Sequence, residues 1–274
     1  MYETLTDRAI IGVSGNDAIN FLHNLTTNDI KQYDYCYNYA LSNQGRYLFD
    51  FFVFKVSSTN LLVDININQV ELFKSHLSRY KLRAKIEIAD LNDTYQVLYS
   101  KEKLEAYAMM SIRDPRYNKL GFRSIIAKEY THYLPTQMAE VQQLYLRDKY
   151  NLAIVDGYED LIYDRSVPVE YGGEELNAVS YTKGCYIGQE IISRAKYQGV
   201  VRKKIFKLFG EINIANILKN DEIVINNTKI GVLCSNYQNM GIALIRLDNY
   251  VSLQNGIATI KNIPVSLSIP DWRL

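Results

Sequence analysis

The chain has 274 residues, of which 47% are hydrophobic, and its 31 lysines and arginines oppose 30 acidic residues, for a formal net charge of +1. This length and hydrophobic content exclude a disordered or fibrous protein and allow two domains. A nearly neutral chain has no long-range field that attracts nucleic acid or an anionic membrane, so any anion site must be local.

The cysteines are Cys36, Cys185 and Cys234, an odd number without CxxC spacing. This pattern argues against a disulfide framework and against a zinc or cluster cage built by one chain. The first residues lack the basic and apolar segments of a signal peptide, and no apolar run approaches the roughly 20 residues that span a bilayer. We therefore expect a cytoplasmic protein with no metal site and no membrane association.

The first part of the chain predicts alternating helices and strands. A helix is expected to begin near residues 15–17, because Ala18, Phe21, Leu22 and Leu25 have the spacing of one buried helix face. Residues 37–57 predict a β-hairpin that turns at residues 42–45, and Asp50 interrupts its second apolar stretch. A helix that begins at Asn68 and an alternating strand over residues 82–88 follow.

Residues 94–150 predict a second small α/β lobe, with strands at 94–100 and 121–127. Its helix is expected to begin at Pro135, with Met138, Val141 and Tyr145 facing inward. Residues 156–178 lack periodicity and predict an irregular segment that crosses a surface or cleft. Short strands after Val200 predict a small antiparallel barrel, which gives two domains, 1–200 and 201–274.

The densest group of chemically capable residues precedes Arg194. A lysine two residues from a thiol favours the reactive thiolate, so Cys185 and Lys183 are the candidate catalytic pair. The residues alone leave an alternative open: the glycines serve turns, the cysteine is a small buried hydrophobe, and Glu190 with Arg194 is an ordinary surface pair. The full motif comprises Lys183, Gly184, Cys185, Tyr186, Gly188, Gln189 and Glu190.

The string KGCYIGQEIISR resembles the K-G-C-Y/F-x-G-Q-E motif of the YgfZ proteins, relatives of the glycine-cleavage T-protein (GcvT). The resemblance continues in DAINFLHNLTTNDI, NQGRYLFD, YKLRAKIEI, DPRYNKLGFR and RSVPVE. It implies an α+β fold of two interleaved α/β lobes around a central folate channel, with a small C-terminal antiparallel β-barrel. It also implies that the protein supports assembly or repair of 4Fe–4S enzymes, including radical enzymes that modify tRNA. The implied cofactor is tetrahydrofolate or a derivative, and the implied partners are iron–sulfur client proteins or assembly factors, with tRNA involved indirectly.

A reduced folate has a guanidine-like pterin edge, a flat linker and an anionic tail, so it needs a carboxylate, an aromatic slot and a cation. Asp50 supplies a carboxylate on an apolar strand, although an edge strand would leave it facing water. Tyr37 is expected to stack on the ligand or to pack in the core. Arg147 matches an arginine that the T-protein family places near its folate, and Glu190 and Arg194 complete the predicted folate site.

One departure bears on activity. The T-protein family has two adjacent aspartates at NQGRYLFD, whereas this chain has Phe49 and Asp50. Phenylalanine neither accepts a proton nor stabilises positive charge, so we expect folate binding without aminomethyl transfer. Two alternatives stay open: a T-protein-like aminomethyltransferase, and a tRNA-binding module that uses the basic stretch over residues 194–207. Strand alternation would split that stretch across two faces, which favours a solvated surface.

Overall fold

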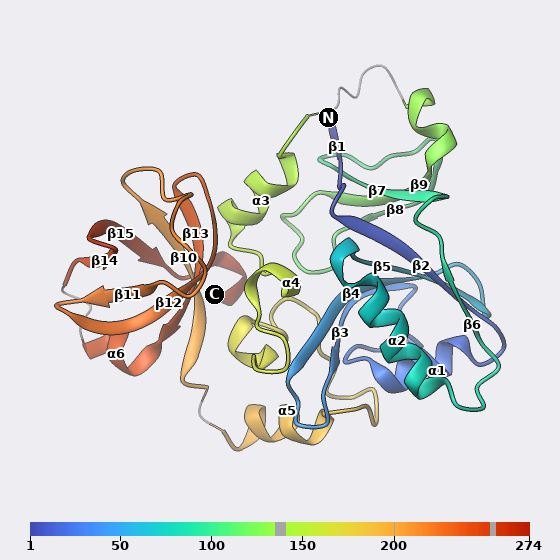
Figure 1. Cartoon of the computed structure of the whole chain (residues 1–274), viewed down its shortest axis with the longest axis horizontal. Coiled ribbons are helices and arrows are strands. Elements are labelled where there is room, and N and C mark those ends of the chain that lie inside the picture. The colour runs from blue at the N-terminus through green and yellow to red at the C-terminus, as the bar shows by residue number, and fades with distance from the viewer. Residues whose placement is uncertain (135–140, 200, 253–255) are drawn as a thin grey trace.

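The structure, a computed structural model, describes residues 1–134, 141–199, 201–252 and 256–274. In this part the chain forms a five-stranded sheet, a four-stranded sheet and a closed six-stranded barrel (Figure 1). The predicted α+β architecture of two α/β lobes and an antiparallel barrel is therefore confirmed.

The five-stranded sheet carries two helices on one face and faces the rest of the molecule with the other. Side chains alternate along a strand, so Phe49 and Phe51 pack under the helices while Phe52 and Phe54 join the central core. The strand order is β3-β4-β5-β2-β6, and all neighbours are antiparallel. The elements are β2 (Arg8–Ser14), α1 (Ala18–Leu25), β3 (Tyr35–Leu41), β4 (Tyr47–Lys55), β5 (Asn60–Asn66), η1 (Ile67–Gln69), α2 (Val70–Lys81) and β6 (Glu87–Asp90).

The predicted strand over residues 82–88 is largely wrong, because β6 begins only at Glu87. Helix α2 ends at Lys81. The next residue, Leu82, has a φ of 42°, in the left-handed region, and its side chain is exposed. The chain then loops across to Asp17, whose Oδ2 accepts a hydrogen bond from the backbone N of Lys85 at 2.8 Å. In this loop Leu82 is exposed, Ala84 is half-buried and Ile86 is buried, so the apolar alternation does not mark one face of a strand.

The four-stranded sheet takes its edge strand from the N-terminus. Its order is β1-β7-β9-β8, so the first residues of the chain pair with β7 across the first lobe, and the two lobes are interleaved. Helix α3 contacts this sheet on one side and the barrel on the other (Figure 1). Pro135 and Met138 lie outside the described residues, and Tyr145 is buried as predicted. The elements are β1 (Tyr2–Thr4), β7 (Tyr95–Ser100), β8 (Ala108–Arg113), β9 (Phe122–Ala127), η2 (Lys128–Tyr133) and α3 (Leu144–Leu152).

The barrel closes in the order β10-β13-β12-β11-β14-β15 around its own apolar core. Its first strand begins at Lys203, and the predicted boundary residue Val200 lies outside the described residues. Before it, the segment predicted to be irregular contains only short helices. The remaining elements are α4 (Gly157–Asp160), η3 (Pro168–Tyr171), α5 (Gln189–Tyr197), β10 (Lys203–Gly210), β11 (Glu222–Ile225), β12 (Thr228–Tyr237), β13 (Met240–Arg246), α6 (Leu247–Ser252), β14 (Ala258–Ile260), β15 (Ile263–Ser268) and η4 (Asp271–Arg273).

Candidate functional site

The side chain of Lys183 caps the C-terminal end of α1. Its ammonium donates hydrogen bonds to the backbone oxygens of His23 at 2.5 Å, Thr26 at 2.5 Å and Asn28 at 2.7 Å. Burial lowers the pKa of Lys183 to about 8. Because an ammonium has three N–H donors, none is left for the Cys185 sulfur. The structure thus gives Lys183 a structural role in place of the predicted activation of the thiol.

Cys185 is exposed at the tip of the loop that leads into α5, whereas Cys36 and Cys234 are buried. Burial raises the pKa of Cys36 to about 11 and raises the pKa of Cys234 further. Gly188 holds the loop against the β3–β4 turn: its φ is 80°, and a Cβ there would lie 2.7 Å from the Ser42 oxygen. The loop therefore presents the one exposed thiol of the three, which corrects the interpretation of Cys185 as a buried hydrophobe.

Three predicted folate contacts lie on exposed surfaces. Arg194 donates to Glu190 at 2.7 Å, one helical turn apart on α5, with side chains 59% and 80% exposed. This is the ordinary surface pair of the alternative interpretation. Arg147 is exposed on α3, while Lys149, two residues further on, points into the buried centre. The helix therefore directs a different cation inward than the one predicted.

Asp50 and Tyr37 do come together, in the core. The Asp50 carboxylate is 1% exposed and accepts hydrogen bonds from the hydroxyls of Tyr37 and Tyr47, both at 2.9 Å. Because β4 is an interior strand, the alternative of an edge strand that leaves Asp50 facing water is wrong. Burial and the Asp50 charge raise the pKa of Tyr37, so its phenol stays protonated and donates. Phe49 lies on the opposite face, against Phe73 on α2.

The space beside Asp50 is filled by a buried ion network. The Arg116 guanidinium lies 5.2 Å from the Tyr37 ring centroid and is fully buried. It donates to Asp114 at 2.7 Å, to Asp156 at 2.5 Å and to the Tyr145 hydroxyl at 2.9 Å.

The network continues into every part of the fold. Asp64 on β5 accepts from Arg8 at 2.6 Å and from Arg123 at 2.8 Å, which joins the two sheets. Lys149 lies 3.2 Å from Asp156 and 3.5 Å from Asp160. Asp160 in turn accepts from Ser235 of the barrel. In the part of the chain that the structure describes, these side chains lie beside Tyr37 and Asp50, and both oxygens of the Asp50 carboxylate already accept tyrosine hydroxyls.

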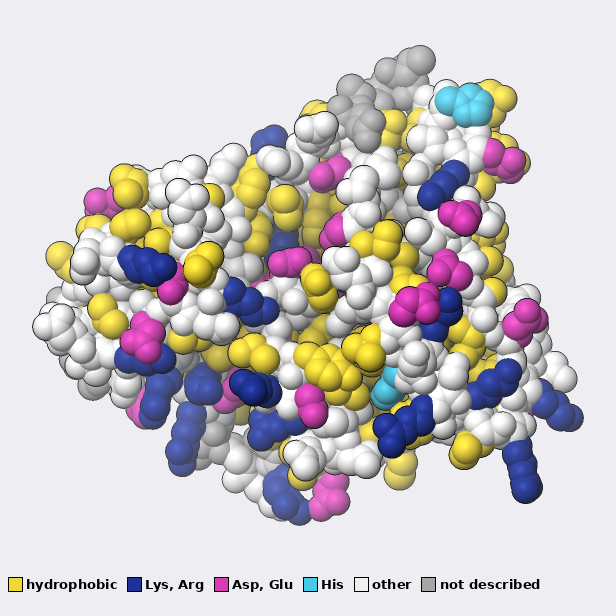
Figure 2. All heavy atoms as spheres, in the orientation of Figure 1, with side chains coloured by type: hydrophobic (Ala, Val, Ile, Leu, Met, Phe, Trp, Pro, Cys, Tyr) yellow, Lys and Arg dark blue, Asp and Glu magenta, His cyan; other side chains and the backbone are white. Residues whose placement is uncertain are grey.

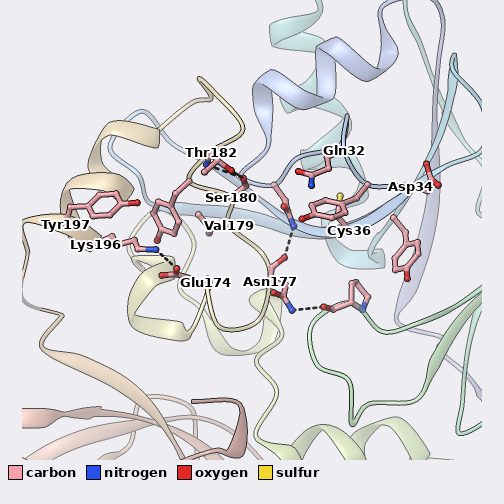
Figure 3. Close-up of a pocket in the computed structure, with 15 residues that line it drawn as sticks. Gln32, Asp34, Cys36, Glu174, Asn177, Val179, Ser180, Thr182, Lys196 and Tyr197 are labelled. Carbon is pink, nitrogen blue, oxygen red and sulfur yellow. Dashed lines mark hydrogen bonds and ion pairs between the residues drawn. The ribbon is translucent and has the colours of Figure 1, made fainter. Parts of the chain in front are cut away.

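A pocket of about 800 Å³ opens at the start of β3 (Figure 3). One wall comes from the start of β3, one from residues 174–182 and one from the end of α5. Thr182 is the last residue of this segment that lines the pocket, and it precedes Cys185 by three residues along the chain. The lining residues are Asn28, Gln32, Tyr33, Asp34, Tyr35, Cys36, Pro115, Glu174, Asn177, Val179, Ser180, Tyr181, Thr182, Lys196 and Tyr197.

The polar groups of the pocket suit a flat ligand with hydrogen-bonding edges. Glu174 supplies a carboxylate, Lys196 supplies a cation, and the Tyr181 hydroxyl is buried without a hydrogen-bond partner among the described residues. An unsatisfied buried hydroxyl is uncommon in folded proteins and indicates an absent partner. The sequence interpretation missed these residues, although it expected residues 156–178 to cross a surface or cleft, and Glu174 and Asn177 come from that segment.

The basic stretch after the motif is largely neutralised. Lys196 pairs with Glu174, and Lys204 pairs with Glu175 at 2.6 Å. Lys207 donates to the backbone oxygen of Asn151. In Figure 2, dark blue cationic side chains gather on the lower side of the barrel with magenta carboxylates among them. Because paired cations offer little to phosphates, this arrangement disfavours an RNA-facing patch.

Comparison with solved structures places the whole chain in one fold. The glycine cleavage system aminomethyltransferase T from Bartonella henselae superposes with a TM-score of 0.74 at 14% identity, over 98% of this chain and 85% of that chain. The family model "CAF17, C-terminal beta-barrel domain" matches residues 202–273, which contain all six barrel strands. The chain therefore has the T-protein fold with a barrel of the CAF17 type.

The curated relatives are more specific. The mitochondrial iron-sulfur cluster assembly factor IBA57 of Mus musculus is 27% identical over 98% of this chain and 84% of its own length. The Homo sapiens protein of that name is 25% identical with the same coverage. The IBA57 homolog of Pyricularia oryzae is 29% identical over 74% of this chain, which spans only about half of that protein, 56%.

The predicted cytoplasmic location is contradicted by these relatives, whose names place them in mitochondria. The argument from cysteine count indicates a reducing compartment at most, and cannot distinguish one such compartment from another. Within the described ranges, no helix is long and apolar enough to cross a membrane. Over the same residues, no group of three or more His, Cys, Asp or Glu side chains is placed to hold a metal ion.

Proposed function

We propose that this chain is an iron–sulfur cluster assembly factor related to the YgfZ proteins, and that it binds a reduced folate in the pocket of Figure 3. The main support is its similarity, over 98% of its length, to proteins named as iron–sulfur cluster assembly factors. The single exposed thiol of Cys185 beside a pocket of ligand size is the structural observation that agrees with this role.

The pocket has the groups that a folate requires. Its volume of about 800 Å³ falls within the roughly 300–1,000 Å³ typical of small-molecule sites. Glu174 is the carboxylate for the amino edge of the pterin, and the exposed rings of Tyr33, Tyr35 and Tyr197 offer apolar faces for the ring system. Lys196 is the cation for the glutamate tail, but it is ion-paired with Glu174 in this structure and must leave that carboxylate to reach the tail.

Cys185 is the candidate contact to the iron–sulfur cluster of a partner. A thiolate is the soft ligand that iron–sulfur clusters use, and this loop presents it to solvent where a client protein reaches it. The clients in this proposal are 4Fe–4S enzymes, including radical enzymes that modify tRNA, and they or other assembly factors supply the remaining cluster ligands. Binding of tRNA by the chain itself is not part of the proposal, because its basic stretch is paired with carboxylates.

Aminomethyl transfer is also outside the proposal, although the fold is that of the T-protein. Phe49, which stands in place of the first aspartate, packs in the helix-covered core and supplies no carboxylate. The neighbouring Asp50 is enclosed by two tyrosine hydroxyls and the ion network. Production of a methylene folate from an aminomethyl donor by the purified protein would contradict this reasoning.

Calorimetric titration with tetrahydrofolate tests the proposed ligand. Loss of a charged hydrogen-bond acceptor costs about 1.5 kcal/mol, so Glu174→Gln should weaken binding about tenfold. Glu190→Gln, an exposed carboxylate outside the pocket, is the matched control and should bind as the wild type does. Absence of binding by the wild type, or equal loss in both variants, would refute the folate site.

The role in cluster assembly is tested separately with Cys185→Ser. We expect this variant to bind tetrahydrofolate normally and to lose most of its ability to restore 4Fe–4S enzyme activity in cells that lack the protein. Full restoration by Cys185→Ser would refute the role of the thiol.

A further inference from the structure

Inside the pocket of Figure 3, the ammonium of Lys196 lies between two tyrosine rings and a carboxylate. It is 3.9 Å from the ring centroid of Tyr181 and 5.4 Å from that of Tyr197, and it forms an ion pair with Glu174. Figure 3 shows Lys196 and Glu174 facing each other, with Tyr197 beside them. Aromatic faces combined with an anion are the arrangement by which proteins bind organic cations. These three residues, Tyr181, Tyr197 and Glu174, are called the tyrosine cage below.

The rings are held in place by more than the lysine. Tyr181 and Tyr197 meet edge to face, with centroids 5.9 Å apart and planes at 72°. Burial raises the pKa of Tyr181, with a contribution from Glu174, so its phenol is neutral and its ring face is electron-rich. The two rings therefore contact each other as well as Lys196.

Lys196 itself is weakly held. Its side chain is 28% exposed and that of Glu174 is 44% exposed, and both line the pocket. Partly exposed ion pairs contribute roughly 0–1 kcal/mol, so a better-matched group in the pocket can replace this one. A flat amidinium matches the cage better than an ammonium, because it stacks on one ring face while donating two hydrogen bonds to the carboxylate.

We infer that the tyrosine cage recognises a flat amidine-like group of the pocket ligand, and that Lys196 is an internal occupant which that group displaces. Once displaced, the ammonium on its flexible four-carbon stem is free to pair with an anionic part of the same ligand. The inference rests on the proposed function only for the identity of the natural ligand, since the pterin edge is such an amidine-like group. Lys196 thus leaves the carboxylate of Glu174 and pairs with a carboxylate of the ligand.

The test uses benzamidine as the probe, because it carries a flat amidinium and no pterin. Binding is measured by calorimetry to the wild type, Lys196→Ala and Lys204→Ala. Lys204, paired with Glu175 outside the pocket, is the matched control. Because the ion pair is worth at most about 1 kcal/mol, we expect Lys196→Ala to bind benzamidine up to about fivefold more tightly than the wild type, with no change in Lys204→Ala. The gain should vanish in the double variant Lys196→Ala with Tyr181→Leu.

The outcomes separate this inference from the proposed function. If Lys196→Ala binds benzamidine no more tightly than the wild type, the displacement is refuted, even where the wild type binds tetrahydrofolate. If Lys196→Ala gains benzamidine affinity while the wild type fails to bind tetrahydrofolate, the cage is supported and the folate proposal fails. A purely structural lysine would lower the urea midpoint of unfolding on substitution without creating affinity for the probe, which also refutes the inference.

Discussion

Replacing Arg116 by methionine tests whether the buried ion network holds the lobes together. Arg116→Met keeps most of the side-chain volume but removes the guanidinium that bridges Asp114, Asp156 and Tyr145. Removing one partner of a buried ion pair costs about 3–5 kcal/mol, because a charge is left without compensation. Asp156 keeps Lys149 and Tyr145, and Asp114 keeps Arg123, at 3.8 Å, and the backbone N–H of residue 116, at 3.1 Å. We therefore expect a loss of about 4 kcal/mol of unfolding free energy.

Urea unfolding followed by circular dichroism measures this loss against Arg113→Met. Arg113 is exposed and donates only to the backbone oxygens of Asn118 and Leu120, so its replacement should cost less than about 1 kcal/mol. A loss of under about 1 kcal/mol in Arg116→Met as well would show that the network contributes little, and would refute the reasoning.

The pH dependence of the unfolding free energy is an independent test of the same residues. Burial alone would raise the pKa of Asp114 and of Asp156, but Arg116 with Arg123 or Lys149 holds both pKa values below the usual range. A depressed carboxyl pKa stabilises the fold above the unfolded pKa of about 4, and this stability is lost as the pH falls through the folded value. The difference between wild type and Arg116→Met should therefore shrink at pH 3.5 relative to pH 7, and a constant difference would contradict the assignment.

Three further outcomes are expected. Lys183→Met leaves three buried carbonyls without the lysine donor, so it should lower the unfolding free energy by about 3 kcal/mol. The alkylation rate of Cys185 should stay unchanged, and slower alkylation would restore Lys183 as the partner of the thiol. Native protein should react with one maleimide per chain, and modification of a second cysteine would show that Cys36 or Cys234 is accessible, as mass spectrometry would detect. Gly157→Ala should cost about 2 kcal/mol because its Cβ would lie 2.4 Å from the Asp50 carboxylate, and equal melting temperatures of variant and wild type would disprove that close contact.

Much of the fold was predictable because it follows from local patterns. The helix-face spacing from Ala18 to Leu25 predicted α1, although the helix ends at Leu25 and not near residues 28–29 as expected. The short strands after Val200 predicted the barrel. The prediction of a strand over residues 82–88 was largely wrong. The helix before it is terminated by the positive φ of Leu82, and apolar alternation does not predict such a backbone conformation.

The candidate site was harder to predict, because its groups are brought together from distant parts of the chain. The contact between Tyr37 and Asp50 joins adjacent strands of a predicted hairpin, and an unpaired carboxylate on an apolar strand was a usable signal. Arg116 and Asp156 are 40 residues apart, and no spacing rule connects them. Lys183 carried the right chemistry for a thiol partner, yet the orientation of its side chain depends on α1, which ends some 160 residues earlier.

The pairing of β1 with β7 also constrains how the molecule is made. Residues 2–4 find their partner only after residues 95–100 have left the ribosome, so the first sheet is complete before the second has its edge strand. A cut between the lobes would leave the first fragment with β1 but without its partner β7. The second fragment would lack its edge strand β1. The edge strand β1 is thus among the last segments of the two lobes to dock, although it precedes the other strands in the sequence.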